Sequence, residues 1–139
     1  MMSDEKSSPS RPRSSPDLKD HRVLVVDDND FNQEMLVEQL ERLGLKVDAA
    51  SHGGEALEKF NATRYSLILT DCRMPVMDGY EFTRRVRSEE RNRSIPPTPI
   101  LAITGAGDDE CREAGMNDIL PKPMRLKDLR EALLSWLPL

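Results

Sequence analysis

The sequence predicts an α/β fold in which five parallel strands form one sheet with helices on both faces. Short, mostly apolar runs of about four to six residues alternate with segments of helical periodicity, a pattern typical of buried parallel strands. Four of these runs lead into an aspartate, a threonine or a lysine. Because crossovers between parallel strands are right-handed, the intervening helices are expected to cover both faces of the sheet.

The first half of the predicted domain holds two strand–helix units. Residues 22–26 predict the first strand and residues 46–50 the second. A helix is predicted over residues 31–43, with Gly44 where a glycine commonly ends a helix. A second helix is predicted over residues 54–60. Inward-facing positions recur at helical spacing in both helices: Met35, Leu36, Leu40 and Leu43 in the first, and Ala56, Leu57 and Phe60 in the second.

The middle of the chain continues the alternation. Residues 65–70 predict the third strand, which runs into a turn-rich loop over residues 74–79. A helix is predicted from about residue 80 to 88. A polar, proline-rich connection over residues 91–99 then leads to the fourth strand at residues 100–103.

The last two units are shorter. A short fourth helix is predicted after Gly107 and before Gly115, with Asp108 or Asp109 as its N-cap. The fifth strand is predicted over residues 119–121, and the last helix over residues 126–137. The apolar face of this last helix comprises Leu126, Leu129, Leu133 and Leu137.

The chain divides into a tail and one domain. Residues 1–19 contain the clusters Ser7-Ser8-Pro9 and Ser14-Ser15-Pro16 and almost nothing apolar. Such a segment buries too little surface to offset the entropy of ordering, so we expect a disordered tail or a linker from a longer protein. Residues 20–139 are enough for one domain with its own core.

Composition excludes several classes of function. The net charge of −5 argues against direct binding of nucleic acid, which needs a basic surface. Cys72 and Cys111 form neither a disulfide framework nor a metal-ligand cluster, and we expect both to be small, partly buried side chains. No apolar stretch approaches the roughly 20 residues of a membrane span, and no signal peptide is visible. A cytoplasmic location is therefore expected.

Aspartates follow two of the predicted strands. Asp27 and Asp28 come after the first strand and Asp71 after the third. Ligands of open parallel sheets bind beyond the carboxyl ends of the strands, so these carboxylates would cluster if the two strands are neighbours. Clustered carboxylates repel one another unless a cation joins them, and hard oxygen ligands suit Mg²⁺. We predict a Mg²⁺ site formed by the three aspartates and the backbone carbonyl of Arg73; alternatively, the first two only cap a helix.

The same edge of the sheet carries groups suited to phosphoryl transfer. Asp71 is the expected nucleophile, because a carboxylate can accept a phosphoryl group as an acyl phosphate. Lys122 offers an ammonium and Thr104 a hydroxyl to the phosphoryl oxygens. Taken singly, Lys122 could be a solvated lysine and Thr104 an ordinary strand end. The Arg73 side chain either contacts the phosphoryl group or is an exposed loop residue.

The motifs VLVVDD, LILTD, MPVMDG, LAIT and PKP stand in this order along the chain. In order and approximate spacing they resemble the receiver domains of two-component response regulators, over about residues 22–137. The resemblance implies a flavodoxin-like (βα)5 fold with strand order 2-1-3-4-5 and a receiver domain over residues 20–139. It also assigns Asp71 as the phosphoacceptor, Asp27 and Asp28 as the acidic pair, Thr104 as the switch hydroxyl and Lys122 as the site lysine.

The residues around the first helix are similar to those of receivers attached to hybrid histidine kinases: Asp28, Asn29, Asn32, Leu40, Leu43 and Gly44. By this resemblance the partner would be a histidine kinase or a histidine-phosphotransfer protein whose phosphohistidine supplies the phosphoryl group. The domain would be a signalling phosphoacceptor that assists its own Mg²⁺-dependent phosphorylation, and not an enzyme. It would be a stand-alone receiver acting through protein contacts, or one domain of a hybrid kinase.

Two features depart from the receiver pattern. Ile119 occupies a position where receivers usually carry tyrosine or phenylalanine, so an aromatic switch is not expected. Only 17 residues separate Thr104 from Lys122, about one helical turn fewer than is usual. We therefore predict a shortened fourth helix that is mobile or partly unwound. The shortening would weaken any dimer built on that helix, so a monomer or weak dimer is expected.

Two other functions remain open from the sequence. A phosphatase with an aspartyl-phosphate intermediate also needs aspartate, Mg²⁺, threonine and lysine, but it usually has a second aspartate where this chain has Arg73. A phosphorylation-independent interaction domain is the third possibility, although such a domain would not need the complete set of polar residues at the strand ends.

Overall fold

The computed structural model of the protein describes residues 20–105, 109–122 and 124–137. Its five strands form one parallel sheet in the order β2-β1-β3-β4-β5, which confirms the predicted flavodoxin-like order. The predicted tail over residues 1–19, together with Gly107 and Asp108, lies outside the described residues. The strands are β1 (Arg22–Val26), β2 (Lys46–Ala50), β3 (Leu67–Asp71), β4 (Ile100–Thr104) and β5 (Asp118–Pro121).

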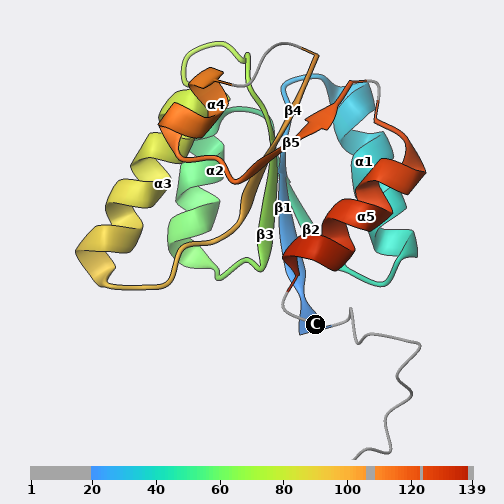
Figure 1. Ribbon diagram of the computed structural model, residues 1–139, viewed down its shortest axis with the longest axis horizontal. Coiled ribbons are helices and arrows are strands. Elements are labelled where there is room, and N and C mark those ends of the chain that lie inside the picture. The colour runs from blue at the N-terminus through green and yellow to red at the C-terminus, as the bar shows by residue number, and fades with distance from the viewer. Residues whose placement is uncertain (1–19, 106–108, 123, 138–139) are drawn as a thin grey trace, which may run out of the picture.

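The helices lie in two layers, one on each face of the sheet (Figure 1). Two helices cover one face and three cover the other, so the architecture is a three-layer sandwich. The first layer holds α1 (Asp30–Arg42) and α5 (Leu126–Trp136), and the second holds α2 (Gly53–Ala62), α3 (Gly79–Arg93) and α4 (Asp109–Ala114). None of the helices in the described residues is long and apolar enough to cross a bilayer.

Each face of the sheet carries its own apolar core. Alternate residues of a strand point to opposite faces, so Val23 and Val25 of β1 pack toward α1 and α5, whereas Leu24 and Val26 pack toward α2, α3 and α4. All five residues of both β3 and β4 are buried. Burial on two faces explains why these strands read as continuous apolar runs in the sequence.

The third helix is longer than the sequence analysis predicted. α3 ends at Arg93, so the start of the predicted connection over residues 91–99 is helical. The last turns of this helix contain few apolar residues, so they show no helical periodicity in the sequence. They instead form exposed ion pairs between residues one turn apart, such as Arg93 with Glu89 at 3.3 Å. Ser94 ends the helix in the left-handed region with φ 55°.

Two apolar residues predicted to face inward are exposed. Met35 of α1 is 45% exposed and Leu126, at the start of α5, is 41% exposed. Both lie at the edge of an otherwise buried helix face, whereas Leu36, Leu40 and Leu129 are buried. The helical periodicity of apolar residues therefore identified the buried face of each helix, but it predicted a wider buried face than the structure has.

The short fourth helix is confirmed. α4 has six residues and stops at Gly115, whose φ of 107° favours glycine. Isolated helices of this length are unstable, so packing must hold it in place. Cys111 and Ala114 supply its buried face. Mobility of this helix remains a prediction.

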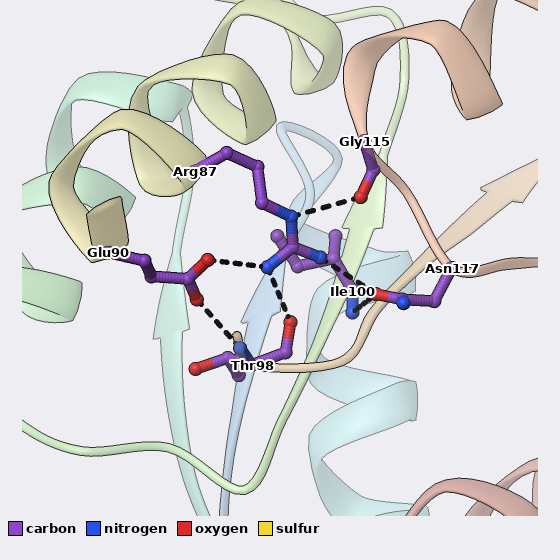
Figure 2. A network of polar contacts seen from close by, with 6 residues as sticks. All are labelled: Arg87, Glu90, Thr98, Ile100, Gly115 and Asn117. Atoms are coloured by element: carbon purple, nitrogen blue, oxygen red, sulfur yellow. Dashed lines mark hydrogen bonds and ion pairs between the residues drawn. The ribbon is translucent and has the colours of Figure 1, made fainter. Parts of the chain in front are cut away.

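A partly buried arginine joins α3 to the segment after α4 (Figure 2). The Arg87 guanidinium donates to the carbonyl oxygens of Gly115 (3.0 Å) and Thr98 (2.9 Å), and to Oδ1 of Asn117 (2.7 Å). It also forms an ion pair with Glu90 at 2.8 Å. Glu90 in turn accepts a hydrogen bond from the backbone N–H of Thr98 at 2.7 Å. The network fixes the C-terminal end of α4 and the start of β5 against α3.

We expect Arg87→Ala to lower the free energy of unfolding by about 3–5 kcal/mol, because it leaves the buried Glu90 carboxylate without its counter-charge. Urea unfolding followed by circular dichroism measures the change. Arg85→Ala is the matched control: its exposed pair with Glu81 on the same helix should contribute less than about 1 kcal/mol. Equal losses in the two variants would show that the Arg87 network does not stabilise the fold.

Candidate functional site

The polar residues predicted to form a site all lie at the carboxyl edge of the sheet, its upper edge in Figure 1. Asp27 and Asp28 follow β1, and Asp71 is the last residue of β3. Because β1 and β3 are neighbours in the sheet, their ends bring these carboxylates together. Thr104 ends β4, and Lys122 comes directly after β5.

The three aspartates form a compact acidic cluster. One carboxylate oxygen from each of Asp27, Asp28 and Asp71 lies within 4.8 Å of the others. Asp27 and Asp71 are buried, while Asp28 is exposed and opens the cluster to solvent. All the possible metal ligands in this cluster are carboxylate oxygens, and they are close enough for one small divalent cation to contact all three residues. The residues present therefore fit Mg²⁺.

Backbone hydrogen bonds orient the two buried carboxylates. Oδ1 of Asp27 accepts from the N–H of Asn29 at 2.9 Å, and Oδ1 of Asp71 accepts from the N–H of Cys72 at 2.8 Å. Burial raises the pKa of Asp27 above its usual value of 3.8. The Asn29 hydrogen bond opposes this shift, and the nearby Asp71 charge adds to it. The charged form of Asp27 is therefore disfavoured by its surroundings in the absence of a cation.

Lys122 provides a positive charge directly at Asp71. Its Nζ lies 3.1 Å from Oδ1 of Asp71, and the two form an ion pair. The lysine side chain is 36% exposed, so the ammonium is reachable from solvent while it contacts a buried carboxylate. Lys122 therefore forms an ion pair with the acidic cluster while part of its side chain stays exposed to solvent.

Thr104 is placed beside these groups by the sheet register. Asp71 pairs with Ile103 across β3 and β4, and Thr104 pairs with Pro121, the residue before Lys122. Thr104 is buried. Arg73 lies in the loop after β3, and its side chain is exposed.

Two residues that shape the site were not identified from the sequence. Nε2 of Gln33 donates to the backbone oxygens of Asp27 and Ala50, each at 3.0 Å, and so clamps the ends of β1 and β2. Gly79 starts α3 against the backbone of the phosphoacceptor candidate: a Cβ there would lie only 2.2 Å from the Asp71 carbonyl oxygen. The Asp78-Gly79 pair at a helix start was the available signal for the glycine, whereas nothing in the sequence marked Gln33.

A groove opens beside the acidic cluster, between α1 and the segment after β5. Its volume is about 440 Å³. Asp27 of the cluster lines the groove, and so does Lys122, which forms the ion pair with Asp71, so the groove and the cluster are continuous. The other lining residues are Asn32, Met35, Leu36, Gln39, Ile103 and Met124.

The two cysteines meet next to the site. Sγ of Cys72, the residue after Asp71, lies 3.6 Å from Sγ of Cys111 on α4. Both thiols are free and fully buried, which corrects the prediction that they are partly buried. Burial raises the pKa of the Cys72 thiol to about 12, and the neighbouring Cys111 adds to this effect.

The sequence of this chain is similar to those of a known domain family and of several histidine kinases. Residues 23–134 match the family model described as the response regulator receiver domain. The chain is 34% identical over 130 residues to hybrid signal transduction histidine kinase E of Dictyostelium discoideum, covering 88% of this chain and 8% of that kinase. It is 36% identical over 137 residues to sensor histidine kinase GacS of Pseudomonas protegens, covering 93% of this chain and 15% of GacS. The chain therefore spans only a small part of the length of these relatives.

Solved structures show the same architecture. The receiver domain of sensor histidine kinase PA1611 from Pseudomonas aeruginosa, which has a magnesium ion coordinated in its active-site cleft, is similar with a TM-score of 0.74 and 40% identity. That match covers 84% of this chain and 96% of the other. The receiver domain of Saccharomyces cerevisiae Ssk1, crystallised with the histidine phosphotransfer protein Ypd1, has a TM-score of 0.80 and 27% identity. This match covers 86% of this chain and 90% of the Ssk1 receiver chain.

We expect Asp27→Asn to raise the melting temperature of the metal-free protein at pH 7, by roughly 2–5 °C. The variant keeps an oxygen for the Asn29 N–H and removes one charge from the cluster. The raised pKa means that ionised Asp27 costs stability at every pH above its folded-state pKa. Below 3.8 the residue is protonated in both the folded and unfolded states, so the advantage of the variant should disappear.

Differential scanning fluorimetry from pH 3 to pH 8 measures this difference. Asp20→Asn is the control, since Asp20 is exposed at the start of the described residues, away from the cluster. If the metal-free wild-type protein is more stable than Asp27→Asn at pH 7, the ionised Asp27 carboxylate does not destabilise the fold, and the inferred repulsion within the acidic cluster is refuted.

Proposed function

The chain belongs to the response regulator receiver domain family, and on that premise we propose that Asp71 is the residue that carries the phosphoryl group. Receiver domains of this family are the phosphoacceptors of two-component phosphorelays. The observation that carries the assignment to Asp71 is its contact with Lys122 within the acidic cluster: among the three aspartates, it is the one for which the described residues include a lysine ion pair.

The proposed reaction transfers a phosphoryl group from a phosphohistidine to Asp71. The N–P bond of the phosphohistidine breaks while a carboxylate oxygen of Asp71 forms a new bond to phosphorus, giving an acyl phosphate. The Cys72 N–H and the Lys122 ammonium both hold Oδ1 of Asp71, so the carboxylate is oriented before the donor arrives. Lys122 also reduces the negative charge that the incoming phosphoryl group meets.

The metal ligands proposed are the carboxylates of Asp27, Asp28 and Asp71 and the backbone carbonyl of Arg73. Clustered oxygen donors and the disfavoured charge of Asp27 support this assignment. When bound, Mg²⁺ would offset the charge of the carboxylates and of the phosphoryl oxygens. The magnesium ion in the cleft of the PA1611 receiver domain supports the choice of metal.

We propose that a histidine kinase or a histidine-phosphotransfer protein docks over the groove beside the site. The groove is continuous with the acidic cluster through Asp27 and Lys122, so a helix seated in it could present its histidine to Asp71. Phe31 and Met35 on the same helix α1 are exposed, at 69% and 45%, and supply apolar contact area. The complex between the Ssk1 receiver domain and Ypd1 is a precedent for this class of partner.

Thr104 is the proposed switch residue, because its hydroxyl lies at the end of β4 directly before the segment leading to α4. Ile119 is partly buried and packs on the core beneath α2, α3 and α4, which supports a packing role instead of an aromatic switch. We propose that the receiver domain, residues 20–139, works in the cytoplasm as a monomer or weak dimer. It assists its own phosphorylation and is not an enzyme acting on free substrates.

An aspartyl-phosphate phosphatase is the alternative with the most similar chemistry. Such an enzyme usually needs an acid–base aspartate two residues after the nucleophile, where this chain has the exposed Arg73. A phosphorylation-independent interaction domain is disfavoured by the ion pair of Lys122 with Asp71 inside an acidic cluster.

Incubation with acetyl phosphate and Mg²⁺ should add one phosphoryl group to the wild-type protein and none to Asp71→Asn, as measured by intact mass. Asp48→Asn is the matched control: this aspartate lies in β2 away from the cluster, and its variant should be modified like the wild type. Addition of a chelator should abolish modification, because the charge of the site is then uncompensated. Modification of Asp71→Asn to the wild-type extent would overturn the assignment, and rapid turnover of phosphomonoesters would favour the phosphatase.

A further inference from the structure

The only two cysteines of the chain are brought together by the fold. They are 39 positions apart in the sequence, yet their sulfur atoms are 3.6 Å apart. A disulfide needs about 2.05 Å between the sulfur atoms, so the two sulfur atoms would have to approach each other by about 1.5 Å. Neither thiol is used in the phosphoryl-transfer chemistry proposed above.

The two thiols lie on elements that differ in length and in burial. Cys72 follows β3, a strand whose residues are all buried in the centre of the sheet. Cys111 lies on α4, which has only six residues and depends on packing to stay helical. The Arg87 network anchors the end of α4 at Gly115, four residues beyond Cys111 (Figure 2). Motion of α4 about that anchor would change the separation of the two sulfur atoms.

We propose that Cys72 and Cys111 are a redox modification site, in which a hydroperoxide converts the two thiols into an intramolecular disulfide that fastens α4 to the end of β3. The proposal goes beyond phosphoryl transfer and does not depend on it. It concerns the covalent state of two side chains that can be read out without phosphorylation. Intracellular disulfides of this kind are usually transient and redox-sensing.

The chemistry balances with hydrogen peroxide as the two-electron oxidant. One sulfur attacks an oxygen of the peroxide, the O–O bond breaks, and the cysteine becomes a sulfenic acid with release of one water. The second sulfur then attacks the sulfenic sulfur and expels the hydroxyl group as a second water. Overall, two thiols and one hydrogen peroxide give one disulfide and two waters.

Burial suppresses the reaction in the closed structure, because it raises the pKa of the Cys72 thiol and the thiolate is the attacking form. Cys72 is 1% exposed and Cys111 is fully buried, so the oxidant reaches them only when the packing over them opens. α4 carries Cys111 and is the shortest helix packed there, so we expect its local opening to expose both thiols. The second step then has its partner thiol beside it, so it should be faster than attack by another molecule.

The test treats the reduced 139-residue chain at micromolar concentration with a series of hydrogen peroxide concentrations. The protein is then denatured and its free thiols are alkylated. The expected product has lost two hydrogens and takes up no alkylating reagent. It remains monomeric on a non-reducing gel, and it gives one linked peptide pair containing Cys72 and Cys111. Dithiothreitol should restore both free thiols.

Matched variants and a thermal measurement complete the test. Cys72→Ala and Cys111→Ala should each retain one thiol that is alkylated or over-oxidised, with no intramolecular link. In the wild type the link closes a loop between positions 72 and 111, so oxidation should raise the melting temperature by roughly 5 °C or more. Neither single variant should show this rise.

Three results would overturn the proposal. The first is that both thiols are still fully alkylated after peroxide treatment. The second is a product dominated by disulfide-linked dimers or by sulfinic acids at single cysteines. The third is an internally linked monomer whose melting temperature is lower than that of the reduced protein. Because none of these readouts uses a phosphoryl donor, failure here leaves the assignment of Asp71 to be judged by its own experiment.

Discussion

The repulsion among the carboxylates of Asp27, Asp28 and Asp71 is the constraint on which the rest of the structure depends. One carboxylate oxygen from each residue lies within 4.8 Å of the others, and two of the three residues are buried, so like charges would meet there unless a cation joins them. The sheet holds them there because β1 and β3 are its neighbouring inner strands and are packed on both faces. Two apolar cores thereby hold an acidic cluster in place that could bind a metal ion.

The groups around the cluster follow from this constraint. Lys122 offers one fixed cation to Asp71, and it leaves the exposed side of the cluster, at Asp28, open to a second. Gln33 ties the ends of β1 and β2 together beside the cluster, and the absence of a side chain at Gly79 lets the start of α3 approach the backbone of Asp71. A phosphoryl group attached at Asp71 would change the charge balance of the whole edge of the sheet. Thr104, the last residue of β4, lies at the same edge.

The strands and the site were largely predictable from the sequence, whereas the lengths of the helices and several contacts were not. β1, β3 and β4 are buried on both faces, so apolar runs marked them and located the polar residues at their ends. The last turns of α3 were missed because charged pairs, not an apolar stripe, stabilise them. The approach of Cys72 to Cys111 depends on packing between distant elements, which no local pattern encodes.

The most direct test of the central claim is a crystal structure of the protein with Mg²⁺ and beryllium fluoride, which mimics a phosphoryl group. The account predicts a metal ion bound by oxygen atoms of the cluster at about 2.1 Å, and a beryllium fluoride adduct on the carboxylate of Asp71 that contacts Lys122. An ion bound away from Asp27 and Asp71, or an adduct on another residue, would contradict it.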